Sequence, residues 1–187
     1  MKLGINMCGR YFIDRNIIDK LLEDMYDARI KPGDVHPGDF GIIASQKGYE
    51  VIRWGKPIGS KLVFNARSES VTTKPFFQDD FNKRRCVIFA RSFYEWNQEK
   101  KQFRFHYPKN GMMLMGGLYD QAGHYVIITK PANNSMIAIH DRMPFLLAPG
   151  VMKDYLFDEE KAKALLKQKQ PPLVNEAMDG QLSLFEV

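Results

Sequence analysis

The sequence has few cysteines and no long apolar run. Cys8 and Cys86 are the only two cysteines among 187 residues, which excludes a disulfide framework and favours a reducing compartment. The segment MKLGINMCGR lacks the apolar core and the cleavage pattern of a secretory signal peptide. No stretch approaches the roughly 18 consecutive apolar residues of a transmembrane helix. These absences predict a soluble, cytoplasmic protein that makes no membrane contact.

Several motifs of common enzyme classes are also absent. The sequence contains neither CxxC nor HExxH, so we expect no metal site. It contains no P-loop and no GxGxxG motif for a dinucleotide. It also lacks the GxSxG motif of serine hydrolases. We therefore expect a function that needs no cofactor.

The composition is that of a folded and mildly basic protein. Hydrophobic residues make up 44% of the chain and aromatic residues 12%, which is enough apolar surface for a core. A length of 187 residues fits one domain. The net charge of +5 comes from 27 Lys and Arg against 22 Asp and Glu. This balance is compatible with a polyanionic partner but does not require one.

Short strands dominate the sequence pattern. Apolar or alternating runs predict strands at 40–44, 49–54, 86–90 and 102–107, and a hairpin at 112–118 and 124–130. Helical spacing predicts helices at 14–26, at 74–84 and from 158 onward. Because strands and helices do not alternate, we expect an α+β fold with mainly antiparallel pairing. We divide the chain into residues 1–6 (leader or cloning-derived), a domain at 7–170 and a loosely attached tail at 171–187.

The segment MCGR could carry covalent chemistry. If Met7 is the initiator and is removed, Cys8 bears an α-amine and a thiol on adjacent carbons. Their reference pKa values of about 7.7–8.0 and 8.5 leave some neutral amine and some thiolate at pH 7. Such an aminothiol condenses with an aldehyde to a Schiff base and closes into a thiazolidine. The alternative is a small buried cysteine before a glycine turn.

The segment VFNARSES could present polar groups from a strand. Asn65 and Arg67 are two residues apart, so a strand would place both on one face. The amide could then hold an amine or a sugar hydroxyl, and the guanidinium a phosphate. The alternative is a polar strand end with a surface arginine.

Two further segments contain candidates for proton transfer. Glu95 lies between Tyr94 and Trp96, and aromatic surroundings disfavour a charged carboxylate, which suits a proton donor and acceptor. The alternative is a glutamate that points to solvent. In IHDRMP, His140 is the side chain best suited to proton transfer near neutral pH, with Arg142 close by. A structural histidine at a strand end is the alternative.

Together these segments resemble the SRAP family, the SOS response-associated peptidase-like proteins. The resemblance covers nearly the whole domain, through MCGR, RWG, NARSES, KPFF, RRCVIFARSFYEWN, GGLYD, ITKPAN and IHDRMP. It implies a DNA damage response enzyme that binds single-stranded DNA and traps abasic sites as a thiazolidine crosslink; we expect a monomer. It also implies a single α+β domain with a bifurcated, barrel-like, mainly antiparallel sheet and peripheral helices.

The resemblance implies roles for individual residues. Cys8 would be the nucleophile, and Asn65 would position the amine or the ring oxygen. Glu95 would shuttle protons, and His140 would assist sugar opening or the Schiff-base step. The residues that would contact DNA are Arg10, Trp54, Arg67 and Arg142.

The sequence departs from the family pattern in three places. The segment between Trp54 and Asn65 is short and lacks a second tryptophan region. Phe89, Arg91 and Ser92 stand where Pro, Asp and Gly are common. Residues 1–6 precede Met7, and while attached they would convert the amine to an amide, so we expect them to occupy or border the cleft.

Two other functions remain open. One is a cysteine peptidase that removes its own leader, with Cys8 as nucleophile, His140 as base and Glu95 as orienting acid. The other is a single-stranded DNA-binding module without chemistry, which would use a basic groove and aromatic side chains.

Overall fold

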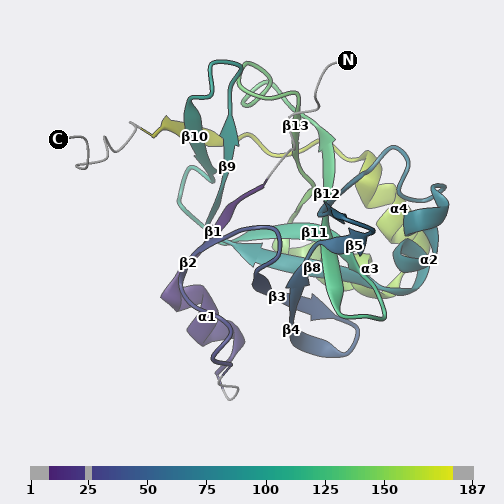
Figure 1. Ribbon diagram of the computed structural model, residues 1–187. Coiled ribbons are helices and arrows are strands. Elements are labelled where there is room, and N and C mark those ends of the chain that lie inside the picture. The colour runs from purple at the N-terminus through teal and green to yellow at the C-terminus, as the bar shows by residue number, and fades with distance from the viewer. Residues whose placement is uncertain (1–8, 24–26, 179–187) are drawn as a thin grey trace.

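Two large sheets form the centre of the computed structural model, which describes residues 9–23 and 27–178. Most strand pairs are antiparallel, and short helices lie around the sheets (Figure 1). The predicted α+β class with mainly antiparallel pairing is therefore confirmed. No helix in the described part of the chain is both long and apolar enough to cross a membrane.

The first sheet has five strands in the order β15-β10-β9-β1-β2, and every pair is antiparallel. Its strands are β1 (Tyr11–Ile13), β2 (Gly33–Val35), β9 (Ser92–Trp96), β10 (Gln102–His106) and β15 (Val174–Ala177). This sheet joins segments that are far apart in the sequence. The start of the described chain thereby lies beside β9.

The second sheet has eight strands. They are β3 (Phe40–Ser45), β4 (Gly48–Trp54), β7 (Asn65–Arg67), β8 (Arg85–Ala90), β11 (Met113–Tyr119), β12 (His124–Pro131), β13 (Arg142–Pro144) and β14 (Leu146–Leu147). Because β12 pairs with both β4 and β11, five strands close into a ring. The strands β8 and β11 are buried along their whole length, which explains why both read as continuous apolar runs.

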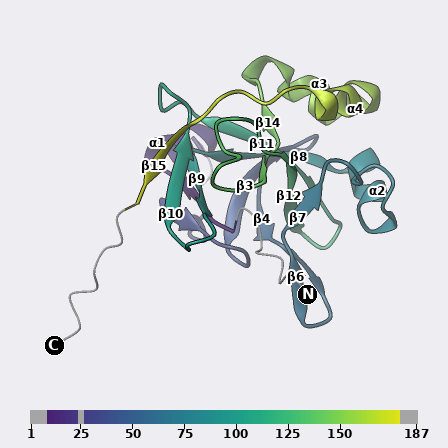
Figure 2. The ribbon, with the colours of Figure 1, turned by 90° about the horizontal axis from the view of Figure 1, so that it is seen from above.

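Four helices and one 3-10 turn lie at the edges of the sheets. They are α1 (Arg15–Leu21), α2 (Pro75–Lys83), α3 (Met152–Phe157), α4 (Glu159–Lys167) and η1 (Pro149–Val151). Asp14 caps α1 by accepting a hydrogen bond from the backbone N–H of Ile17 at 2.9 Å, and Asp158 caps α4 in the same way. Figures 1 and 2 show α2, α3 and α4 on one side of the molecule and α1 on the other.

Three elements differ from the sequence expectation, and long-range contacts explain two of them. The helix α1 ends at Leu21 rather than at 26, and its buried residues are Ile17, Ile18 and Leu21. The Pro- and Gly-rich stretch before Phe40 contains β2, which exists through its pairing with β1. Within the tail at 171–187, Val174–Ala177 forms β15 on the edge of β10. Nothing local in the sequence signals a strand that forms only by pairing with a distant one.

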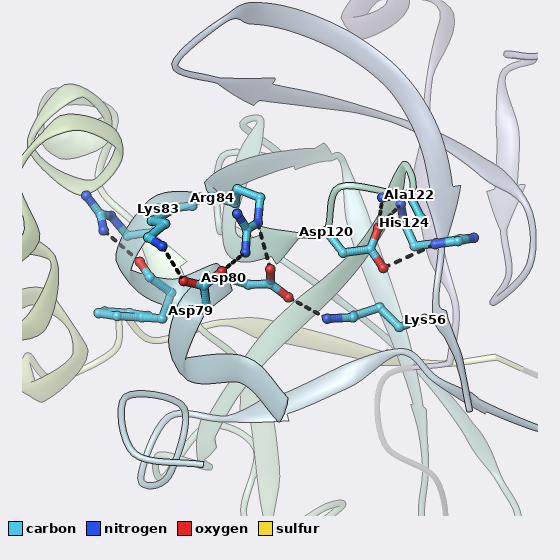
Figure 3. A network of polar contacts seen from close by, with 10 residues as sticks. Lys56, Asp79, Asp80, Lys83, Arg84, Asp120, Ala122 and His124 are labelled. Atoms are coloured by element: carbon cyan, nitrogen blue, oxygen red, sulfur yellow. Dashed lines mark hydrogen bonds and ion pairs between the residues drawn. The ribbon is translucent and has the colours of Figure 1, made fainter. Parts of the chain in front are cut away.

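A small hairpin connects β4 to β7 of the second sheet. It consists of β5 (Lys56–Ile58) and β6 (Lys61–Val63), and Figure 2 shows β6 in a hairpin that projects from the sheets. Lys56 is anchored to α2 by Asp80, which also accepts from the Nε of Arg84 at 2.7 Å (Figure 3). Because β7 follows this hairpin directly, the buried ion pair helps to hold the start of β7 in place.

Candidate functional site

The described chain begins one residue after Cys8, so Cys8 itself lies outside it. The expected position of residues 1–6 at the cleft lies outside it too. Gly9 and Arg10 lead into β1, and the carbonyl of Arg10 accepts a hydrogen bond from the backbone N–H of Tyr94 at 3.0 Å. The pairing of β1 with β9 therefore continues toward Gly9, alongside the strand that carries Glu95.

Glu95 lies on β9 and is only 1% exposed. In the strand register it lies opposite Phe103 of β10. The alternative of a glutamate that points to solvent is therefore excluded. Glu95 is thus a carboxylate shielded from water on the strand that pairs with β1.

Asn65 and Arg67 occupy alternate positions of β7, which runs parallel to β12. Between them, Ala66 is buried on the opposite face. The two polar side chains therefore lie on one face of a strand, as the sequence predicted. Arg67 is exposed, and within residues 9–23 and 27–178 no ion pair or side-chain hydrogen bond engages its guanidinium.

Arg142 lies at the start of β13 and is only 7% exposed. Its guanidinium binds both carboxylate oxygens of Glu69, at 2.8 Å for the Nη2–Oε2 pair, and it donates to the carbonyl of Thr129 at 2.8 Å. The hydrogen bonds from Arg142 lower the pKa of Glu69 to about 2. Both Nη atoms of Arg142 are thus engaged, so a phosphate would have to compete with Glu69.

His140 is oriented by the same segment. Its Nδ1 lies 3.1 Å from the backbone N–H of Arg142, which donates to it. Burial disfavours the imidazolium and lowers the pKa of His140, against the opposing effect of Asp141. Although a carboxylate oxygen of Asp141 lies 3.3 Å from Nδ1, that side chain is 82% exposed, so its charge is screened by water. We therefore assign a neutral His140 with its proton on Nε2.

Arg10 lies over two aromatic rings. Its guanidinium carbon is 5.5 Å from the ring centre of Tyr94 and 5.3 Å from that of Trp96. One Nη lies 3.4 Å from a carboxylate oxygen of Asp34 on β2. The Arg10 side chain remains 29% exposed, just before β1 and next to the strand of Glu95.

Among the predicted site residues, Trp54 has the position that agrees least with its expected role, which was to contact DNA. It is fully buried, and its Nε1 donates to the carbonyl of Phe64 at 2.9 Å. Its ring lies parallel to that of Tyr125 and tilted against that of Tyr11, with centroid distances of 6.2 and 5.3 Å. A ring without exposed surface offers no face to a DNA base, so we place Trp54 in the core.

The predicted residues therefore form two groups, and the aromatic cluster around Trp54 connects them. Arg10 and Glu95 belong to the first sheet; Asn65, Arg67, His140 and Arg142 belong to β7, β13 and the turn before β13. Tyr11 of β1 packs on Trp54, whose indole binds the residue just before Asn65. The cluster thus fixes the start of β7 relative to the start of β1.

Sequence reasoning missed the groups that hold these side chains. Glu69 was noticed only as part of NARSES, and its bond to Arg142 joins positions 73 residues apart. Asp34 lies outside all the sequence motifs quoted above. The hydroxyls of Tyr11 and Tyr125, which lie 2.8 Å apart in the core, also escaped notice because the two residues are far apart in sequence. No group of three or more metal-ligating side chains occurs within the described residues.

The fold and the site together define a class of protein. The family model of the SOS response associated peptidase (SRAP) matches residues 7–182, so this chain belongs to the SRAP family. The abasic site processing protein YoqW of Bacillus subtilis is 30% identical in an alignment 182 residues long that covers 80% of this chain and 80% of its own. The abasic site processing protein YedK of Escherichia coli is 29% identical and covers 84% of this chain and 82% of its own.

Solved structures agree with this fold. A crystal structure of a protein from Bordetella bronchiseptica superposes with a TM-score of 0.76 at 23% identity, and covers 92% of this chain and all of its own. A phage-related protein of the same organism has a TM-score of 0.71 at 21% identity, with 91% of this chain and 94% of its own covered. At these identities the likeness supports the fold alone.

Proposed function

We propose that this chain binds single-stranded DNA and forms a covalent thiazolidine crosslink to abasic sites through Cys8, once Cys8 is the N-terminal residue. The observation that carries the proposal is the buried Glu95, which lies on the strand paired with the residues that follow Cys8. Relatives named abasic site processing proteins support the choice of substrate.

The proposed reaction needs no oxidant and no cofactor. The α-amine of Cys8 adds to the aldehyde carbon of the ring-opened sugar, and loss of one water gives a Schiff base. The thiol then adds to the carbon of the C=N bond while its proton passes to nitrogen, which closes the five-membered ring. Glu95 is the group that accepts and returns protons during these steps.

His140 and Asn65 would act on the sugar. Because Nδ1 of His140 accepts from Arg142, the hydrogen on Nε2 is available for the ring oxygen, which must gain a proton when the sugar opens. This tautomer disfavours His140 as the base of a cysteine peptidase, since Nε2 has no free lone pair to take a thiol proton. Asn65 would hold the amine or the ring oxygen from the face of β7 that it shares with Arg67.

Arg67 is the phosphate contact that the geometry supports best. Arg10 already binds Asp34, and Arg142 already binds Glu69. Each arginine would therefore contact a phosphate only in competition with its carboxylate partner. Trp54 is reassigned to the core. The DNA contacts are therefore electrostatic and indifferent to base sequence.

One experiment separates the three candidate functions. The protein, expressed from Met7, is incubated with a single-stranded oligonucleotide that contains one abasic site and is then run on a denaturing gel. A heat-stable shifted band supports the proposal. Peptide turnover without that band would instead support the peptidase, which the family description names. Retention on a native gel with neither result would leave a binding module.

Glu95→Gln will slow crosslink formation by about a hundredfold or more, because the amide keeps the shape and loses the proton that general acid–base catalysis needs. The rate is measured on denaturing gels over time, and a thermal melt checks that the buried position tolerates the change. Glu99→Gln, an exposed position just after β9, is the matched control and should react at the parent rate. Equal rates for both variants would reassign Glu95 to the structure.

Arg67→Ala will weaken binding to undamaged single strands and flatten the dependence of log affinity on log salt by about 0.7, the value for one phosphate contact. Fluorescence anisotropy at a series of salt concentrations measures both effects. The control is Arg15→Ala on α1, an exposed arginine on the side of the molecule opposite α2. An unchanged salt slope for Arg67→Ala would remove β7 from the DNA-binding surface.

A further inference from the structure

Glu69 lies in the turn that follows β7 and is bound to the first residue of β13. Its two carboxylate oxygens accept hydrogen bonds from both Nη atoms of Arg142. The strand β12 pairs with β7 on one side, as Figure 2 shows, and with β13 on the other. The ion pair therefore crosses β12 and joins the strand of Asn65 and Arg67 to the segment that carries His140.

The turn that carries Glu69 is held at several points. The carbonyl of Thr129 on β12 accepts from the backbone N–H of Ser68 at 2.9 Å and from Nη2 of Arg142 at 2.8 Å. Val71, two residues after Glu69, is fully buried and fixes the far side of the turn. The carboxylate of Glu69 is thereby kept beside the guanidinium of Arg142.

Arg142 needs this carboxylate because its side chain is 9% exposed, whereas that of Glu69 is 50% exposed. A guanidinium is always charged, and a buried charge is unfavourable without a partner. Among the described residues, Glu69 supplies the only ion pair of Arg142. Because the hydrogen bonds from Arg142 lower the pKa of Glu69 to about 2, the carboxylate stays ionised in neutral and weakly acidic buffers.

The backbone of Arg142 orients the ring of His140. Its N–H donates to Nδ1 at 3.1 Å, which leaves the hydrogen of the neutral ring on Nε2. If the ion pair with Glu69 were lost, the start of β13 would be free to shift and this N–H would no longer point at Nδ1. The carboxylate of Asp141, 3.3 Å from Nδ1, could then accept a hydrogen from that nitrogen and favour the opposite tautomer.

We propose that Glu69 is a positioning residue for His140 and acts through Arg142 to keep the hydrogen of the imidazole on Nε2. The orientation of the ring follows from the contacts above, and its use in sugar opening rests on the proposed function. In that step the bond between the aldehyde carbon and the ring oxygen breaks. The proton of the hydroxyl on the same carbon passes to the ring oxygen through water. The Nε2–H donates a hydrogen bond to the ring oxygen while negative charge develops there.

Long-range nitrogen–proton NMR spectra of the imidazole rings test the orientation without DNA. The parent should show a neutral ring with its hydrogen on Nε2, in a signal that His140→Ala removes. In Glu69→Gln this ring should change wholly or partly to the tautomer with hydrogen on Nδ1. The matched control is Glu159→Gln, which removes an exposed ion pair with Lys163 on α4 and should leave the signal unchanged. An unchanged signal in Glu69→Gln would overturn the proposal.

Crosslinking rates on two oligonucleotides test the consequence for sugar opening. On an abasic oligonucleotide, Glu69→Gln should react more slowly by about tenfold or more. On an oligonucleotide whose aldehyde ends an open chain that cannot close into a ring, it should react at the parent rate. A Glu69→Gln/His140→Ala double variant should be no slower than His140→Ala, because both changes disturb one step. Equal slowing on both oligonucleotides, or effects that multiply, would contradict the positioning role.

The remaining outcomes separate this role from the alternatives. If the parent crosslinks neither oligonucleotide, the proposed function fails and the tautomer measurement alone decides the role of Glu69. If Glu69→Gln binds undamaged single strands about tenfold more tightly and crosslinks at the parent rate, Glu69 competes with DNA for Arg142 and does not position His140. A thermal melt checks folding. If Glu69→Gln is unfolded, a Glu69→Met/Arg142→Met variant, which leaves no unpaired buried charge, replaces it and should show the same change of tautomer.

Discussion

Cys8→Ala will abolish the heat-stable crosslink to an abasic oligonucleotide while affinity for undamaged single strands stays unchanged. The thiazolidine needs a sulfur atom to close its ring, whereas the phosphate contacts proposed for Arg67 do not involve Cys8. The alanine variant keeps its α-amine after Met7 is removed, so it still forms a reversible Schiff base. Denaturing gels run with and without borohydride reduction measure this difference, because reduction converts only the Schiff base into a stable amine.

Cys86 provides the control for this experiment. It is fully buried in β8, and burial raises the pKa of its thiol well above the usual value, which removes the reactive thiolate. Cys86→Ala should therefore crosslink at the parent rate, provided that a thermal melt shows the variant folded. A heat-stable adduct of full strength from Cys8→Ala without reduction would disprove the assignment of Cys8.

Keeping residues 1–6 attached will reduce formation of the stable crosslink about as much as Cys8→Ala does. In a chain that keeps MKLGIN, the nitrogen of Cys8 is part of a peptide bond and cannot form a Schiff base. Such a chain should form no stable adduct, yet it should bind single strands as well as the shorter chain does, because Arg67 is unchanged. A chain expressed from Met7 should lose that methionine and react.

Intact mass and crosslinking, measured together on both chains, check this expectation. The mass shows whether Cys8 is the first residue, and the gel shows whether that chain reacts. If a chain whose mass retains residues 1–6 crosslinked as fast as one that begins at Cys8, the aminothiol mechanism would be wrong. If the longer chain lost these residues by itself and Cys8→Ala prevented the loss, the peptidase alternative would gain support.

The sequence by itself determined the local elements and the candidate residues. The helices predicted to begin near residues 14, 74 and 158 are α1, α2 and α4; Asp14 and Asp158 cap the first and the last, and Pro75 opens α2. Such start signals depend only on near neighbours in the sequence. Continuous apolar runs predicted β8 and β12, and the alternation of Asn65 and Arg67 on one strand face was confirmed. The order of the motifs predicted the family, to which the chain belongs.

Only the tertiary structure decided how these residues are used. Glu95 is buried on β9, the strand between β1 and β10, and a single strand sequence contains no information on its partners or on what covers its faces. Trp54 was expected at the DNA surface and lies in the core, since rings from distant strands surround it. Arg142 was expected to be open to phosphate and is bound by Glu69, because β7 and β13 both pair with β12. Burial and pairing depend on contacts between distant segments, and those contacts exist only in the folded chain.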